Sequence, residues 1–118
     1  MSSLGPLGQE MPKRLKRALR EAAMAAHEEE LRRALIPLEA AFQQWRAGRV
    51  GSGELAELIH GFHEGPAREL FKKYNYGQLE LVVAHAIVAG ILDPSRLPAD
   101  LVEALGRAIA FYEEQGRS

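Results

Sequence analysis

The stretch from Leu79 to Leu92, LELVVAHAIVAGIL, decides the fold, because every residue in it except Glu80, His85 and Gly90 is apolar. A helix that is apolar on all sides is typical of the centre of a fold. The stretch is shorter than the roughly 20 residues that a helix needs to cross a bilayer. It therefore predicts a central, buried core helix at about residues 77–90, and no membrane span.

The rest of the chain predicts an all-α fold. The 118 residues are 47% hydrophobic, which suits one domain with its own core. No run alternates between polar and apolar residues for long enough to indicate a strand. We expect a compact orthogonal bundle of five or six helices over residues 12–118. Residues 1–11 contain serine, glycine and proline with little charge, so we expect a flexible leader there.

Prolines and glycines predict where the helices end. Pro37 lies inside the apolar series Leu31, Leu35, Leu38, Phe42 and Trp45, so we expect a kink or a break near residues 33–36. Gly48–Gly51 should end that series, and Ser52 is a good N-cap for the next helix. That helix has one apolar face, made by Leu55, Leu58, Ile59 and Phe62.

The second half of the chain is divided in the same way. Gly65 and Pro66 should end the preceding helix and start another, which is short. Asp93 and Pro94 break the chain after the apolar helix. A last helix should begin at Pro98, with its buried stripe formed by Leu101, Leu105, Ala108, Ile109 and Tyr112.

Composition narrows the function. The chain has no cysteine and no secretory signal, which excludes disulfides and cysteine-based zinc sites and favours a cytoplasmic location. Its net charge of −1 gives no overall attraction to nucleic acid or anionic lipid. The nucleophile elbow, the P-loop and the dinucleotide fingerprint are all missing from the sequence. No cofactor is predicted.

A basic stripe is the first candidate site. It is formed at helical spacing by Lys13, Lys16, Arg17 and Arg20, and it lies opposite an apolar stripe formed by Leu15, Leu19, Ala22 and Ala26. Such a stripe can follow a phosphate backbone or lie on an anionic membrane. An ordinary solvated helix face is the favoured interpretation, because Glu28–Glu30 follow directly and no aromatic residue stands between the cations.

A polar group is the second candidate site, and its members are Glu57, His60, His63, Glu64 and His85. The first four supply nitrogen and oxygen ligands within eight residues, and Glu57 and His60 have the Glu-x-x-His spacing of di-iron bundles. That motif is needed twice and occurs once, so a polar helix face is the simpler interpretation. We expect His85 to be buried, neutral and hydrogen-bonded within the core.

These features favour a small helical interaction or regulatory protein that acts through protein–protein contacts. A homodimer is expected, because Leu15 and Leu19 with a few alanines anchor the first helix only weakly to its own chain. The first alternative is a nucleic-acid-binding protein that uses the basic stripe. The second is a metal-dependent enzyme around His60, His63 and His85.

Overall fold

The computed structural model describes residues 11–116, and within that range it contains helices and no strand. The all-α prediction is therefore confirmed. None of the described helices is both long enough and apolar enough to span a membrane. The elements in chain order are α1 (Lys13–Arg46), α2 (Ser52–Phe62), a π-helical turn (His63–Ala67), α3 (Arg68–Tyr76), α4 (Leu79–Val88), a 3-10 turn (Pro94–Arg96), α5 (Ala99–Ala104) and α6 (Gly106–Gly116).

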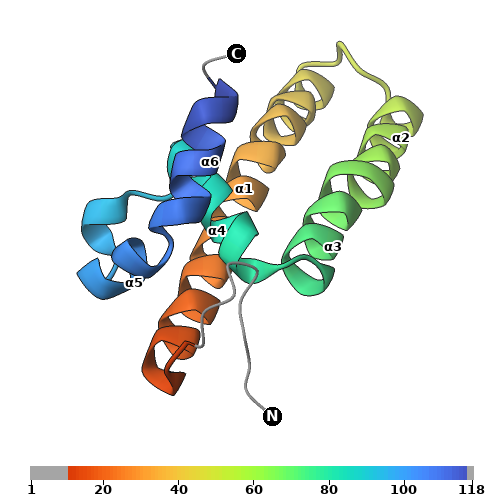
Figure 1. Ribbon diagram of the computed structural model, residues 1–118. Helices are drawn as coiled ribbons and strands as arrows, with labels where there is room; N and C mark the ends of the chain where they lie inside the picture. Colours follow the sequence, from red (N-terminus) through yellow and green to blue (C-terminus); the bar gives the residue numbers. More distant parts are fainter. Residues whose placement is uncertain (1–10, 117–118) are drawn as a thin grey trace.

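The molecule is extended, so the prediction of a compact bundle is wrong. Its dimensions are 56 × 33 × 26 Å and its radius of gyration is 17.8 Å, against about 13 Å for a compact domain of about 100 residues. The cause is α1, whose 34 residues rise about 1.5 Å each and run the length of the molecule. Figure 1 shows α1 with the arm formed by α2 and α3 on one side and α5 and α6 on the other.

The helix does not break before Pro37. Proline removes a single backbone hydrogen bond, the one that the carbonyl of Arg33 would accept from residue 37. The flanking segments are rich in alanine, leucine, glutamate and glutamine, which favour a helix. The local cost of Pro37 is therefore absorbed, and α1 continues to Arg46.

The helical path also continues through Pro66, where the sequence predicts an end. Pro66 has no N–H to donate to Phe62, and its ring crowds the turn before it. The chain responds with a π-helical turn over His63–Ala67, which leads directly into α3. One long, interrupted arm therefore replaces the two separate helices expected here (Figure 1).

Glycines end both α1 and α4; the sequence predicts the end at Gly48, whereas the role of Gly90 emerges from the structure. Gly48 and Gly90 have φ values of 77° and 76°, the left-handed region that favours glycine. After α1, the N–H of Arg49 donates to the carbonyl of Gln44 at 2.9 Å. After α4, the N–H of Ile91 donates to the carbonyl of Ala86, also at 2.9 Å. Both ends are Schellman motifs, which satisfy carbonyls that the helices leave open.

The core lies around the N-terminal half of α1. Its buried residues come from α1, α3, α4, α5 and the residue after α5, and they are Leu15, Leu19, Ala22, Ala23, Ala26, Tyr74, Val83, Ala86, Leu101 and Leu105. Met11, the last residue of the expected leader, also packs against it; residues 1–10 lie outside the described range. The helix predicted from Pro98 is divided at Leu105 into α5 and α6.

Helix α4 is central, since it packs against α1, α3 and α6, but it is not buried on all sides. Val83, Ala84 and Ala86 are buried, whereas His85 is exposed. Successive helix positions are 100° apart, so the three small or branched residues turn one arc of the helix inward and leave His85 on the opposite arc. The prediction of a buried His85 is therefore wrong.

Candidate functional site

The C-terminal half of α1 and α2 form an antiparallel hairpin that extends away from the core (Figure 1). Both helices carry the apolar series that the sequence predicts for a buried face, yet of those residues the structure buries only Leu55. Five of them are between 38% and 45% exposed: Leu35, Phe42, Trp45, Leu58 and Ile59. We call the combined series the hairpin face; its members are Leu31, Leu35, Leu38, Phe42, Trp45, Leu55, Leu58, Ile59 and Phe62.

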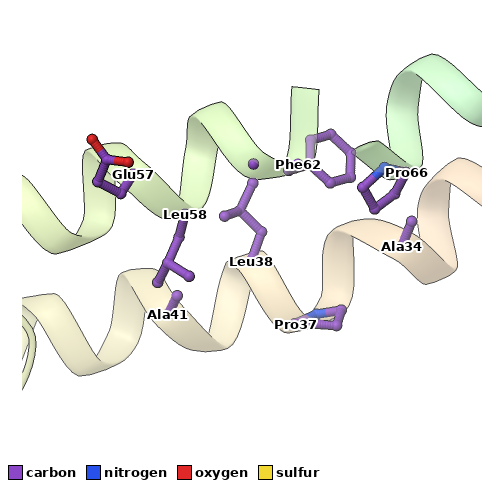
Figure 2. Close-up of a pocket in the computed structure, with 9 residues that line it drawn as sticks. Ala34, Pro37, Leu38, Ala41, Glu57, Leu58, Phe62 and Pro66 are labelled. Carbon is purple, nitrogen blue, oxygen red and sulfur yellow. The ribbon is translucent and has the colours of Figure 1, made fainter. Parts of the chain in front are cut away.

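A groove of about 380 Å³ lies between the two helices of the hairpin. Figure 2 shows Leu38 and Leu58 directed into the space between α1 and α2, with the Glu57 carboxylate directed away from α1. Small residues open the groove, because Ala34 and Ala41 of α1 and Gly61 of α2 leave space that larger side chains would fill. Glu57 is the one charged residue in its lining.

A side-chain hydrogen bond fixes the tip of the hairpin. The indole Nε1 of Trp45 donates to the hydroxyl of Ser52 at 3.0 Å. Ser52 was predicted to be the N-cap of α2, but Gly51 takes that position and the Ser52 side chain makes no cap hydrogen bond. The hydroxyl instead connects the end of α1 to the beginning of α2, and this contact helps to hold the two helices in register.

A polar cluster lies where the arm meets the core, and no sequence pattern predicts it. The Oε2 atom of Glu30 in α1 accepts a hydrogen bond from Lys73 Nζ at 2.8 Å and another from the Tyr74 hydroxyl at 2.5 Å. The ring of His27 stacks on that of Tyr74, with their centroids 5.0 Å apart. Lys73 and Tyr74 are separated from Glu30 by 43 and 44 positions in the sequence. No periodic pattern predicts a contact over such a separation.

Charge and burial shift the pKa values of this cluster. Burial alone would raise the pKa of Glu30, but the hydrogen bonds from Lys73 and Tyr74 outweigh it and hold that pKa below its ordinary value. Burial, together with the hydrogen bond to the Glu30 carboxylate, raises the pKa of Tyr74 well above its ordinary value. Glu30 is therefore ionised and Tyr74 neutral at pH 7, which is the combination that their hydrogen bond requires.

The structure divides the predicted polar site. Glu57 lines the hairpin groove, whereas His63 and Glu64 line a second hollow of about 430 Å³ together with Arg68 and Phe71. His60 is exposed on α2 and lines neither hollow. Within residues 11–116, no three or more histidine, aspartate and glutamate side chains gather closely enough to hold a metal ion.

His85 lies in a different environment from the one that the sequence predicts for it. Its ring packs edge to face against Tyr112 of α6, with the centroids 5.1 Å apart. Its interaction with Glu30 is the smallest of the contributions that lower the pKa of that carboxyl. An aromatic contact on the surface of α4 thus replaces the buried hydrogen bond that the sequence predicts.

The basic stripe occupies the face of α1 that the sequence predicts. Lys13, Arg17 and Arg20 are exposed and Lys16 is half-buried, while the opposite apolar stripe is buried. That burial removes the argument for a dimer seam at Leu15 and Leu19, because α1 already packs these side chains against its own chain. The binding of nucleic acid by the stripe stays a prediction.

Comparisons of the chain with protein-family models, with curated proteins and with solved structures find no match. The chemistry of its own surface is therefore the basis for any functional proposal.

Proposed function

We propose that this protein is a small helical interaction protein that binds other polypeptides through its hairpin face. One observation carries the proposal: two helices present apolar series at the spacing of a buried face, and five of those side chains remain more than a third exposed. An exposed apolar patch of several hundred Å² is typical of an interaction site. The groove, which Leu38, Leu58 and Phe62 of this face help to line, offers an apolar pocket for a partner's side chain.

The fold gives this surface a rigid base. The core on the N-terminal half of α1 buries its own apolar residues without help from the hairpin. Glu30 and Lys73 connect the arm to that core through an ion pair of 2.8 Å. The hairpin is therefore presented as a projecting element, and its apolar side chains are open to a partner.

Site-specific photo-crosslinking in cells tests the proposal. A photoreactive amino acid at position 59, on the hairpin face, should form covalent adducts with a second polypeptide. The matched control is the same amino acid at position 111, where Phe111 is also an exposed apolar residue, on α6. Adducts at position 59 should disappear when Leu35→Glu is added, because a charge cannot be buried unpaired in an apolar contact.

A crosslinked adduct at position 59 does not by itself support the proposal. Support requires that the adducts form at position 59 and not at position 111, and that Leu35→Glu removes them. Equal adducts at positions 59 and 111, or adducts at position 59 that survive Leu35→Glu, would show that the hairpin face is not a specific interface.

A further inference from the structure

We infer that the partner of the hairpin face is the hairpin face of a second copy of this chain, so that two hairpins form a four-helix bundle about a two-fold axis. The inference rests on the proposed function and names its partner. Four-helix bundles bury the apolar series of two hairpins against each other, with short connections between neighbouring antiparallel helices. Each copy supplies half of such a bundle, including the short connection from residue 47 to residue 51.

The exposed area matches what such a dimer needs. The hairpin face leaves roughly 400–500 Å² of apolar surface exposed, if a fully exposed large side chain offers about 200 Å². A standard interface buries about 800 Å² from each partner, and about 65% of a homodimer interface is apolar. The apolar share needed from one copy is therefore about 500 Å², which the hairpin face comes close to providing.

Symmetry and charge are compatible with self-association. A two-fold dimer joins the same patch of both copies, so an apolar patch needs only to fit itself. The chain has a net charge of −1, so two copies repel each other only weakly. The side chains of the hairpin face are uncharged, and the groove lining contributes a single carboxylate, that of Glu57.

Sedimentation velocity of the purified full chain tests the inference, at concentrations from about 1 to about 100 µM. The expected species has twice the 13.0 kDa mass of one chain. Leu35→Glu combined with Ile59→Glu should raise the dissociation constant at least about 100-fold, because each charge enters the interface twice. Phe111→Glu is the matched control, since it replaces an apolar residue outside the hairpin that is at least as exposed as Leu35 and Ile59, and it should leave the dimer unchanged.

Circular dichroism of each variant shows whether the helices persist. If the double variant unfolds, Phe42→Lys replaces it, because Phe42 is 39% exposed and lies far along α1 from the core. A dimer lost only on hairpin substitution supports the inference. A dimer that survives hairpin substitution, or one that Phe111→Glu abolishes equally, overturns the inference. The proposed function falls with it only if the crosslinks at position 59 also survive Leu35→Glu. The third outcome is a protein that stays monomeric at all concentrations but forms crosslinks to a different protein, and these crosslinks depend on Leu35. This result overturns the inference that the partner is a second copy, and the proposed function stands.

Discussion

At the scale of single residues, Glu30 is the side chain with the clearest structural role. Its carboxylate accepts hydrogen bonds from Lys73 and Tyr74, and it thereby joins the middle of α1 to the end of α3. The Glu30 and Lys73 side chains are only 19% and 30% exposed, so solvent screens this ion pair less than a surface pair. Removing the charge leaves two donors with a weaker acceptor in a half-buried place.

We expect Glu30→Gln to lower the free energy of unfolding at pH 7 by about 1.5–3 kcal/mol, the range for hydrogen bonds to charged groups. The pKa of Glu30 is lower in the folded chain than its ordinary value of 4.5. Its contribution is therefore complete above pH 4.5 and is lost as the pH falls through the lower, folded value. Urea unfolding of both proteins between pH 3 and 7 should show the difference shrinking towards acid.

The matched control for this prediction is Glu28→Gln. Glu28 is exposed and close by on α1, and it should change the stability by less than about 0.5 kcal/mol at any of these pH values. A Glu30→Gln deficit that stays constant down to pH 3 would contradict the assignment of Glu30 as an ionised acceptor.

At the scale of elements, the sequence predicts the ends of helices better than their continuity. Helix ends depend on local backbone conformation and capping, so the sequence indicates them at Gly48 and at the Asp93–Pro94 pair. At the second of these, Asp93 Oδ1 accepts a hydrogen bond from the N–H of Ser95 at 2.9 Å. The sequence predicts a kink or a break before Pro37, and the end of one helix and the start of another at Gly65 and Pro66. Neighbouring turns absorb the loss of the hydrogen bond that each proline removes, in one case with a π-helical turn, and no local pattern shows it.

The same limit applies to the candidate sites. The apolar series of the hairpin follows from its spacing, but its exposure depends on which elements cover it, and among residues 11–116 α2 packs mainly against α1 and the π-helical turn. His85 was expected to be buried because its neighbours are apolar, yet α4 buries the arc of Val83 and Ala86 and leaves the His85 side open. The Glu30 cluster depends on a long-range contact between α1 and α3 that periodicity cannot reveal.

The turn between α3 and α4 has no space for a side chain at Gly77. A Cβ atom there would lie 2.5 Å from the carbonyl oxygen of Lys73, a backbone atom that cannot move without shifting α3. We expect Gly77→Ala to lower the free energy of unfolding by about 1–3 kcal/mol, as overpacking does. Lys73 also binds Glu30, so the pH dependence that Glu30 gives to stability should weaken in the same variant.

Gly53→Ala is the control for Gly77→Ala. Gly53 lies in α2 with no atom within 4 Å of the Cβ position, and alanine there should stabilise the chain by up to about 1 kcal/mol because glycine is a poor helix former. Thermal or urea unfolding gives both values. Equal effects at the two positions would show that the turn tolerates a side chain and that its close approach is not a constraint.

At the scale of the whole molecule, burial is distributed unevenly. The N-terminal half of α1 and α4 share the core, whereas α2 buries a single residue, Leu55. Local stability follows buried apolar contact, so regions with little of it open more readily than the whole chain unfolds. We therefore expect backbone amides of α2 to exchange with deuterium faster than those of α4 in dilute protein.

Measuring amide exchange at several protein concentrations separates the low local stability of the arm from the effect of a second copy. Pairing of two hairpins stabilises only the state that binds, so it should slow exchange in α2 and in the C-terminal half of α1 as the concentration rises. Exchange in α4 should not change, because its buried residues face α1 and α6 within one chain. The Leu35→Glu, Ile59→Glu variant should show fast α2 exchange at every concentration. Uniform protection along the wild-type chain at low concentration would mean that the hairpin is held by contacts other than those between two copies, and that its apolar series needs no partner for stability.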